Sequence, residues 1–394
     1  MPNIKRMMMA AAGGSGGAST ETVGELWTWG GGWSGQLGLG NTTNRSEPTQ
    51  VGSLTDWEKV NAGSRPNNNA AIKTDGTLWT WGYNYYGSLG IGTSQASLGA
   101  NADKSSPVQV GSLTNWFIAG GGDNCMVAIK TDGTLWSWGL TNYGQGGRNN
   151  STNVSSPVQI GSLTDWKGSS SDEVLTDGET KIGSGSYNSH IIKNDGTLWG
   201  WGWGAQSTVG DSSTTNRSSP VQIGSGTDWA SISPSYSYNV CAVKTGGTLW
   251  TWGRGDEGAL GHGDTTTRNS PVQVGSLTTW KFVCAGYKWS CAVKTDGTLW
   301  AWGDNSKGQL GLGDTTSRSS PVQVGSLTDW LRPLSGYQHN RVLKTDGTLW
   351  AWGNNDVGQL GLGDTTNRSS PVQVGSAASW GKVLGGNTHT AAVR

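Results

Sequence analysis

Hydrophobic and polar positions along the chain repeat as a hairpin, which is plainest at residues 291–303. There, Cys-Ala-Val-Lys and Thr-Leu-Trp-Ala-Trp-Gly flank an Asp-Gly centre. Residues of both runs favour strands, and Asp-Gly tolerates the positive φ angles of a tight type I′ turn. We therefore predict an antiparallel hairpin with a two-residue turn in each copy.

The second half of this hairpin, Leu-Trp-x-Trp-Gly, occurs seven times at intervals of 50 to 63 residues. The copies begin at Leu26, Leu78, Leu135, Leu198, Leu249, Leu299 and Leu349. Each copy is followed by a proline shortly before Gln-Val-Gly or Gln-Ile-Gly, in the first copy before Thr-Gln-Val-Gly, and then by another tryptophan. This period is typical of one four-stranded blade of a β-propeller.

Both alternating faces of residues 298–302 are apolar, so this strand is expected to be buried on both sides, between two blades. Burial of one indole contributes about 4–6 kcal/mol before the entropy cost. Each indole N–H then needs a partner, and we expect the backbone of a neighbouring blade to supply it. The paired tryptophans are therefore predicted to form core, not a sugar-binding platform.

The two ends of the repeat region complete each other. Residues 388–394 form only the first strand of a hairpin, with Arg394 where most copies carry lysine, and residues 24–27 begin the second strand without its first. Pairing of these strands closes a ring and leaves no exposed sheet edge at the seam. We predict an all-β fold, a seven-bladed β-propeller over residues 25–394.

Three motifs together resemble regulator-of-chromosome-condensation repeats: Leu-Trp-x-Trp-Gly, residues 308–314 and residues 320–324. The resemblance covers residues 25–394 and implies a seven-bladed β-propeller. The eukaryotic founder of that family exchanges nucleotide on a small GTPase and touches chromatin through basic segments. This chain has no such basic tail beyond Lys5 and Arg6, and no exchange residue matches by position, so fold analogy does not carry that function across.

The tryptophan-rich, uniform repeats are more similar to those of bacteria and phages. The opening Lys-Arg-Met-Met-Met-Ala-Ala-Ala-Gly, residues 5–13, resembles the starts of structural proteins from marine phages. This second resemblance implies a virion protein.

Composition excludes several classes of partner. The 27 basic and 27 acidic residues balance, and 14% of residues are charged where about 25% is usual, so we expect no nucleic-acid binding and no membrane insertion. Four cysteines lack metal-ligand spacing and are interpreted as small buried side chains. The apolar run from Met7 to Ala12 is too short for a signal peptide, which favours assembly inside a host cytoplasm.

Residues 1–24 form a Met/Gly-rich segment, which we interpret as an extended anchoring tail. A neighbouring subunit is the partner expected to hold it. Its predicted contacts are Ile4, Lys5, Arg6, Met7, Met8 and Met9. The alternative is that the tail folds back on its own propeller.

Candidate catalytic chemistry is sparse, and we expect no enzyme, no cofactor and no metal. Residues 13–17 match Gly-x-Ser-x-Gly but lack the flanking strand and helix of a nucleophile elbow. The four histidines lie in different repeats without ligand spacing. Asp264, Asp314 and Asp364 each precede an arginine by four residues, which indicates a capped turn more than a cation site.

The departures from the repeat are more informative, because propellers present variable loops on one face. After Trp-Gly, the first four blades carry aromatic residues, whereas the last three carry charged or polar ones. Inserts around residues 93–103 and 167–185 also fall in the early blades. The aromatic arc consists of Trp33, Tyr83, Tyr85, Tyr86, Tyr143 and Trp203. It predicts a contact patch for protein or glycan, unless the rings pack on the inserts or the tail.

These observations favour a non-enzymatic interaction scaffold. Its most concrete form is a phage virion component, such as a capsid decoration, tail or fibre protein, anchored by residues 1–24 to other virion proteins. The exposed propeller would then contact a neighbouring subunit, or a host surface protein or glycan. The alternatives are a cytosolic regulator of the nucleotide-exchange type and a glycan-binding lectin.

Overall fold

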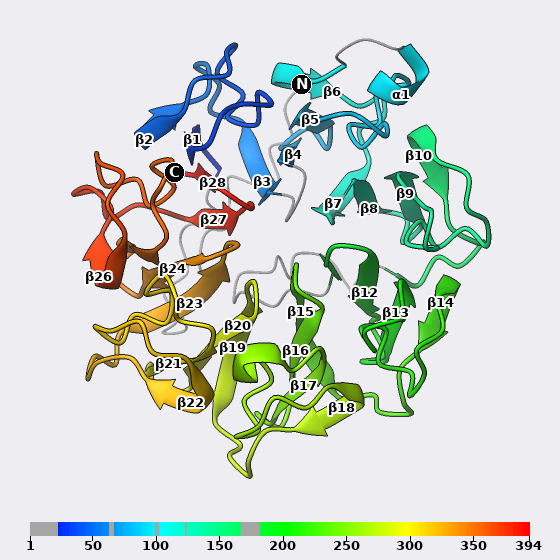
Figure 1. Ribbon diagram of the computed structural model, residues 1–394. Helices are drawn as coiled ribbons and strands as arrows, with labels where there is room; N and C mark the ends of the chain where they lie inside the picture. Colours follow the sequence, from blue (N-terminus) through cyan, green and yellow to red (C-terminus); the bar gives the residue numbers. More distant parts are fainter. Residues whose placement is uncertain (1–22, 63–66, 99–101, 123, 167–181) are drawn as a thin grey trace, which may run out of the picture.

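Each repeat folds into four antiparallel strands because its strand-forming runs are separated by glycine-containing turns. The computed structural model of the protein describes residues 23–62, 67–98, 102–122, 124–166 and 182–394. These residues form seven four-stranded sheets, arranged around an axis like the blades of a propeller (Figure 1). The predicted all-β, seven-bladed fold is confirmed.

From the innermost strand outward, the sheets follow chain order in six blades and join both chain ends in the seventh. The sheets are β3 (Trp57–Ala62), β4 (Asn68–Lys73), β5 (Leu78–Gly82) and β6 (Lys104–Gln109); β7 (Trp116–Gly121), β8 (Cys125–Lys130), β9 (Leu135–Gly139) and β10 (Val154–Gln159); β11 (Ile182–Ser184), β12 (Asn188–Ile192), β13 (Leu198–Gly202) and β14 (Arg217–Gln222); β15 (Trp229–Pro234), β16 (Asn239–Lys244), β17 (Leu249–Gly253) and β18 (Arg268–Gln273); β19 (Trp280–Ala285), β20 (Trp289–Lys294), β21 (Leu299–Gly303) and β22 (Arg318–Gln323); β23 (Trp330–Ser335), β24 (His339–Lys344), β25 (Leu349–Gly353) and β26 (Arg368–Gln373); and β27 (Lys382–Gly385), β28 (His389–Val393), β1 (Leu26–Gly30) and β2 (Arg45–Gln50).

The ring closes in two ways. The innermost strands contact one another all the way round, in the order β27, β3, β7, β11, β15, β19, β23 and again β27. In the seventh sheet, β28 pairs with β1 from Leu26 opposite Val393 to Gly30 opposite His389. The Glu25 N–H donates to the Arg394 carbonyl (2.9 Å), and the Arg394 N–H donates back to Glu25 (3.0 Å). The predicted closure by the terminal strands is confirmed.

The second tryptophan of each Leu-Trp-x-Trp-Gly strand is fully buried between two blades. In the described residues, six of these seven indoles donate to a backbone carbonyl of the preceding blade, as predicted. The pairs are Trp81 to Gln36, Trp138 to Ser88, Trp201 to Gln145, Trp252 to Thr208, Trp302 to Ala259 and Trp352 to Gln309. The first tryptophan differs, because it is half-buried and bonds within its own hairpin, as Trp300 does to Thr298 Oγ1 (2.9 Å).

A cation at the end of the second strand of each blade lies between two tryptophan rings. The cations are Lys73, Lys130, Lys193, Lys244, Lys294, Lys344 and Arg394. Lys344 also pairs with Asp329 (3.2 Å), and its ammonium lies 4.5 Å from the Trp350 ring centroid. Lys294 has a threonine at the position of that aspartate and approaches Trp300 to 3.7 Å. Burial lowers the pKa of the Lys294 ammonium.

The Asp-Gly turns differ from the predicted geometry. In the β20–β21 hairpin, the Gly297 N–H donates to Lys294 O and the Lys294 N–H donates to Thr298 O, both at 3.0 Å, so the loop has three residues. Gly297 has a φ of +77°, whereas Asp296 keeps a negative φ. This is a type I turn followed by a left-handed glycine, and the prediction of a two-residue type I′ turn was wrong. Asp296 Oδ1 accepts both the N–H (2.9 Å) and the hydroxyl (2.7 Å) of Thr298, which holds the aspartate in this conformation.

One of the two predicted inserts is shorter than expected. Residues 182–184, placed in the insert over residues 167–185, form β11, the innermost strand of its blade, while residues 167–181 lie outside the described residues. The other insert contains the short helix α1 (Gln95–Leu98), and a 3₁₀ turn, η2 (Asp256–Gly258), follows β17. Across the described ranges, the helices are too short to cross a membrane.

The hairpin turn between β16 and β17 has glycine where the other described turns have aspartate, and we predict that replacing this glycine stabilises the fold. Gly246 occupies the aspartate position before Gly247, its φ lies outside the left-handed region, and a Cβ there would meet no heavy atom within 4 Å. Gly246→Asp is expected to raise the free energy of unfolding by about 1 kcal/mol, through reduced freedom of the unfolded chain and new bonds to Thr248. Urea titration followed by tryptophan fluorescence measures the change.

The neighbouring glycine provides the control. Gly247 has a φ of +75°, and a Cβ there would lie 2.2 Å from the Thr278 carbonyl oxygen. Gly247→Ala should therefore lower stability. Equal effects of the two substitutions would contradict the proposed turn geometry.

Candidate interaction face

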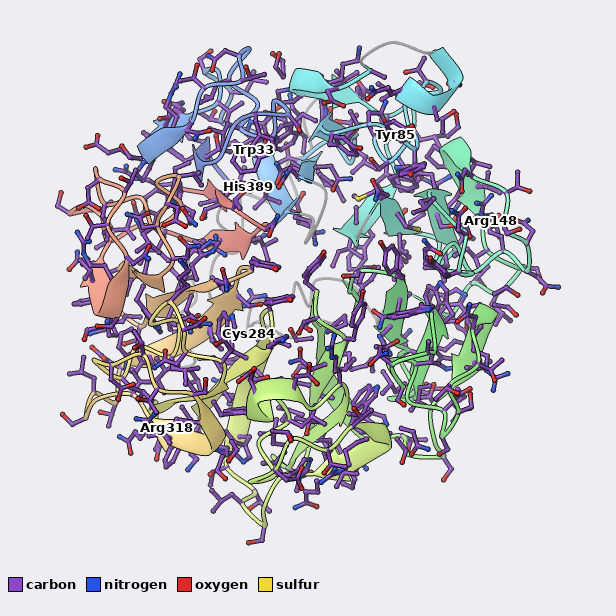
Figure 2. The ribbon with its side chains drawn as sticks, in the orientation of Figure 1. Trp33, Tyr85, Arg148, Cys284, Arg318 and His389 are labelled. Carbon is purple, nitrogen blue, oxygen red and sulfur yellow. The ribbon has the colours of Figure 1, made fainter. Side chains whose placement is uncertain are left out.

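The loops that carry the predicted contact residues all leave the sheets on one face. Because the strands are antiparallel, the loop after the first strand and the loop after the third strand emerge together, opposite the Asp-Gly turns. In the β19–β22 blade these loops are residues 286–288 and 304–317. We call the face formed by the equivalent loops of all blades the loop face. Figure 2 labels Trp33 and Tyr85, two of its aromatic side chains.

The lateral aromatic cluster consists of Tyr143, Tyr187, Trp203 and Tyr238, from loops of three neighbouring blades. The Tyr143 ring centroid lies 5.1 Å from Tyr187 and 6.1 Å from Trp203, and Trp203 lies 4.6 Å from Tyr238. Tyr143 keeps 40% of its surface exposed. The cluster therefore joins the blades on this face while presenting an aromatic surface to solvent.

The central tyrosines, Tyr236, Tyr287 and Tyr337, lie nearer the propeller axis. Tyr287 and Tyr337 stack with centroids 4.2 Å apart, and Tyr236 lies 5.2 Å from Tyr337. Two of them, Tyr236 and Tyr337, also line the cavity on the axis. Beside this cluster the Asp256 carboxylate pairs with Lys288 (3.7 Å) and with Arg254 (2.6 Å), so one negative charge faces two positive ones.

The predicted aromatic arc falls on the loop face, but it is divided. Tyr83, Tyr85 and Tyr86 form one group, with Tyr85 36% exposed and 4.6 Å from Tyr86. Tyr143 and Trp203 belong to the lateral aromatic cluster. Trp33 is 47% exposed, and no ring contact in the described part of the chain joins it to either group. The predicted tail contacts, Ile4, Lys5, Arg6, Met7, Met8 and Met9, lie outside the described residues.

Sequence reasoning missed five aromatic residues of this face: Tyr187, Tyr236, Tyr238, Tyr287 and Tyr337. They lie in the loop between the first and second strands, whereas the prediction followed only the loop after Trp-Gly. A signal was present, since Gly-Tyr-x comes directly before the second strand at Tyr287 and Tyr337.

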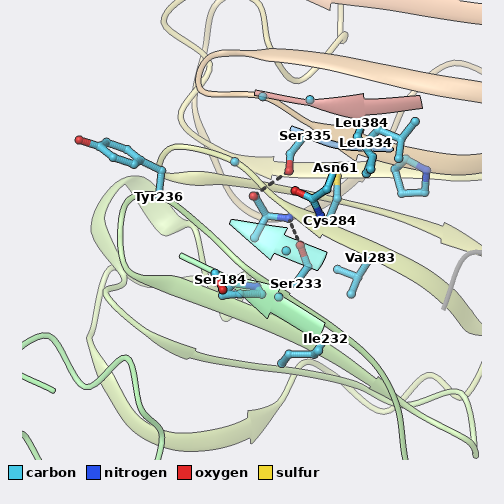
Figure 3. A pocket seen from close by; sticks show the side chains of 18 of the residues that line it. Asn61, Ser184, Ile232, Ser233, Tyr236, Val283, Cys284, Leu334, Ser335 and Leu384 are labelled. Atoms are coloured by element: carbon cyan, nitrogen blue, oxygen red, sulfur yellow. Dashed lines mark hydrogen bonds between the residues drawn. The ribbon is translucent and has the colours of Figure 1, made fainter. Parts of the chain in front are cut away.

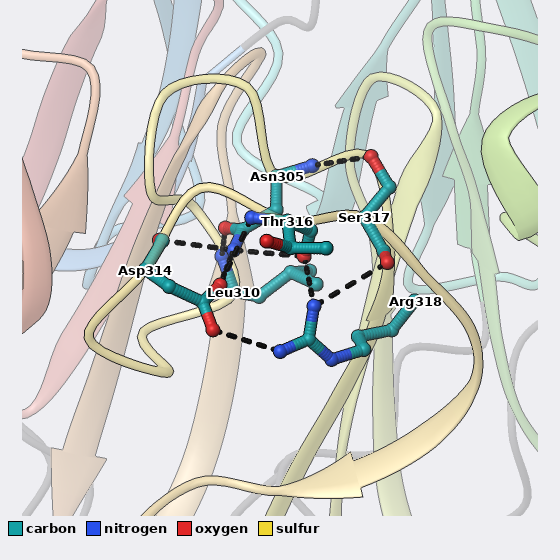
Figure 4. A network of polar contacts seen from close by, with 6 residues as sticks. All are labelled: Asn305, Leu310, Asp314, Thr316, Ser317 and Arg318. Atoms are coloured by element: carbon teal, nitrogen blue, oxygen red, sulfur yellow. Dashed lines mark hydrogen bonds and ion pairs between the residues drawn. The ribbon is translucent and has the colours of Figure 1, made fainter.

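The Asp–Arg segments form closed turns at the rim of the propeller, as predicted (Figure 4). Asp314 Oδ1 accepts the Thr316 N–H (2.9 Å) and the Asn305 amide (2.9 Å), and Asp314 Oδ2 accepts from Arg318 (2.8 Å). Hydrogen bonding to Thr316 holds the pKa of the Asp314 carboxyl below its usual value. With these oxygens already bonded, the segment serves as a structural turn.

The repeats and the fold together decide the family. The pattern of the regulator of chromosome condensation (RCC1) repeat matches residues 23–65, 75–129, 246–293, 296–343 and 346–393, and a second pattern of the same repeat matches residues 280–309. The chain belongs to the RCC1 repeat family. One solved structure of the same fold is that of yeast RCC1 (Prp20), which was crystallised bound to Kap60.

Two curated relatives match about two thirds of this RCC1-repeat chain. The ultraviolet-B receptor UVR8 of Arabidopsis thaliana is 27% identical over 277 residues, which are 69% of this chain and 59% of UVR8. The human E3 ubiquitin-protein ligase HERC2 is 29% identical over 272 residues, 68% of this chain and 5% of HERC2. The chain thus spans less than two thirds of the length of either relative.

Two solved structures share the fold. Human WBSCR16 superposes with a TM-score of 0.79 at 20% identity, covering 94% of this chain and 98% of that one. Yeast RCC1 (Prp20) superposes with a TM-score of 0.78 at 16% identity, covering 98% and 95%. At these identities the likeness concerns the fold alone.

Several histidines and cysteines are buried inside the propeller, where they pack with other side chains. Burial lowers the pKa of His190 to about 4 and that of His389 to about 3, so both imidazoles are neutral at pH 7. His389 Nε2 bonds to Asn69 Oδ1 (2.9 Å), which joins β28 to β4 of the neighbouring blade. The four cysteines are free and buried, as predicted. Among the described residues, no group of three or more His, Cys, Asp and Glu side chains is arranged to hold a metal ion.

Proposed function

We propose that the chain is a non-enzymatic scaffold whose loop face binds a protein partner. The carrying observation is the gathering of aromatic side chains on that face, with Trp33, Tyr85 and Tyr143 exposed by 47%, 36% and 40%. Exposed tyrosine and tryptophan supply large contact area at little entropy cost and dominate protein interfaces. The protein binding recorded for yeast RCC1 supports the same class of function.

Site-specific photo-crosslinking in the source cell tests this proposal. A crosslinking amino acid placed at Trp33, Tyr85 or Tyr143 is expected to capture the same partner from each position. Leu113, Leu163 and Leu327 provide matched controls, because they are exposed by 45%, 48% and 46% and lie on the opposite face. A partner captured equally from the leucine positions, or only from them, would contradict a loop-face site.

Once that partner is identified, alanine variants measure how much each aromatic side chain contributes to the binding free energy. Tyr143→Ala is expected to weaken binding by about 30-fold, the effect of a typical aromatic interface residue of about 2 kcal/mol. Leu163→Ala should leave affinity unchanged. Circular dichroism and the unfolding midpoint of both variants separate a loss of binding from a loss of fold.

The finer form of this proposal is a phage virion component, assembled in the host cytoplasm and anchored through residues 1–24. Its support is the resemblance of residues 5–13 to marine phage structural proteins and the balanced, weakly charged composition. The test compares the full chain with a chain starting at Thr22, each mixed with purified particles and imaged by negative stain. Incorporation of the full chain alone supports the anchor, and equal behaviour of the two chains contradicts it.

The second candidate is a regulator of the nucleotide-exchange type, which family membership favours. It predicts that the partner captured from the loop face is a small GTPase, and that adding the propeller accelerates release of a fluorescent GDP analogue from it. A captured virion protein, or a GTPase whose nucleotide release is unchanged, would exclude this candidate.

A further inference from the structure

A cavity of about 150 Å³ lies on the propeller axis, lined by the innermost strands and by loops that follow them (Figure 3). This volume far exceeds the about 10–15 Å³ that one water requires. Two serines of its wall bond to the backbone of Ala285. Ser233 Oγ accepts the Ala285 N–H (3.0 Å), and the Ser335 hydroxyl donates to the Ala285 carbonyl (2.8 Å). Ser233 accepts in this bond and its hydroxyl donates to no residue in the described ranges, so its O–H can donate to a ligand.

The charge that lines this cavity is positive. Arg332, from β23, lines it and also lines an adjoining cavity of about 90 Å³, together with Lys59 and Lys382. Within the described ranges, neither cavity is lined by Asp or Glu, and Arg332 makes no hydrogen bond or ion pair. A half-buried guanidinium without a counter-charge carries a desolvation cost, and burial lowers its pKa to about 10.

A second guanidinium lies directly behind the cavity wall. Arg341 is fully buried, and its Nη1 donates to the His389 carbonyl (3.2 Å) and to the Thr390 hydroxyl. Its Nε and Nη2 have no hydrogen-bond partner among the described residues. Nη2 abuts Gly385, a residue of the cavity wall, so closely that a Cβ there would lie 1.7 Å from it.

The groups around these guanidiniums do not neutralise them. Cys284 also lines the cavity, but burial raises the pKa of its thiol well above the usual value, so it stays uncharged. Burial also lowers the pKa of His339 and His389, which are neutral at pH 7. The axial region therefore carries one buried and one half-buried positive charge, and in the part of the chain that is described no carboxylate lines the two cavities.

We propose that the axial cavity binds a small oxoanion, of the phosphate or carboxylate type. Arg332 provides charge-assisted donors, the Ser233 hydroxyl and the Asn61 amide at the wall provide neutral donors, and Arg341 contributes positive potential through Gly385. The anion supplies the counter-charge that the described side chains lack. This site is independent of the loop-face partner, so either proposal stands without the other.

Isothermal titration calorimetry of the full chain tests the site. Inorganic phosphate and acetate are titrated separately at constant ionic strength, and chloride is the reference anion. Saturable binding of one anion per chain is expected from at least one of the two, and the preferred anion identifies the chemistry. Arg332→Gln should weaken it at least about tenfold, as the loss of a charge-assisted bond does. Arg318→Gln is the matched control, because Arg318 lies on the rim, paired with Asp314, and it should leave the affinity unchanged.

If the Arg332→Gln variant does not fold, two further measurements still test the proposed anion site. Arg341→Cys copies the residue that β20 carries at the equivalent position, Cys291, and should weaken binding through loss of potential alone. Crystals of the unchanged protein grown with selenate should show anomalous density beside Arg332. Heats indistinguishable from chloride for both anions, or equal affinity in the Arg332 and Arg318 variants, would overturn the proposal.

Discussion

Removal of residues 389–394, which are β28 and the following Arg394, should abolish the folded propeller. This strand is the second of its sheet and pairs with β1 on one side and β27 on the other. Ala391, Ala392 and Val393 are fully buried, so the deletion removes both a strand ladder and part of two inter-blade cores. The remaining strands become unpaired edges of the kind that aggregate. Size-exclusion chromatography should show aggregate, and thermal scans should show no cooperative transition.

Two control variants distinguish the effect of losing ring closure from the effect of shortening the chain. Deleting Arg394 alone removes its contacts with Trp27 and Trp380 and its two backbone bonds to Glu25, but keeps the pairing of residues 389–393 with β1, and should lower stability much less. A circular permutant that joins Arg394 to Glu25 through a Thr-Asp-Gly turn, with new ends in the turn at Asp346, should fold and unfold cooperatively. The proposal that the fold depends on pairing of β28 with β1 would be contradicted if the truncated chain folded or if the permutant did not.

Trp302→Ala is expected to cost about 3–5 kcal/mol of unfolding free energy, the range for deleting a buried aromatic side chain. Trp302 is fully buried between the blades of β15–β18 and β19–β22, where it packs with Leu249 and Val283. Its indole also donates to the Ala259 carbonyl of the preceding blade (2.9 Å). The substitution therefore removes apolar contact and an inter-blade bond together. Denaturant titration followed by circular dichroism measures the loss.

Phenylalanine variants separate the two contributions. Trp302→Phe keeps most of the apolar volume and removes the inter-blade hydrogen bond, with an expected cost of about 1–2 kcal/mol. Trp300→Phe removes an indole bond that stays within one hairpin, from a half-buried ring, and should cost less. A larger loss from Trp300→Phe would show that the inter-blade bond is not what distinguishes the two tryptophans.

The axial cavity and the loop face are built by residues that the chain keeps far apart. Ser233, Ala285 and Ser335 come from three repeats and meet through two hydrogen bonds. Likewise Tyr143 and Trp203 lie in different blades and come within 6.1 Å only when the ring forms. A repeat predicts that equivalent positions recur, but it does not predict which unlike residues of neighbouring blades will touch.

Sequence alone determined the repeat, the seven blades, the buried tryptophans and the closing strands, because each depends on local strand propensity or on a pattern copied in every unit. It also predicted the hairpins, but not their turn, since Asp-Gly suits both turn types and the bonds from Thr298 to Asp296 that accompany the three-residue loop appear only in the structure. The division of the aromatic residues into clusters, and the unpaired guanidiniums of Arg332 and Arg341 at the axis, appeared only in the tertiary structure. Their surroundings come from loops and innermost strands of different blades, and closure of the ring is what brings these together.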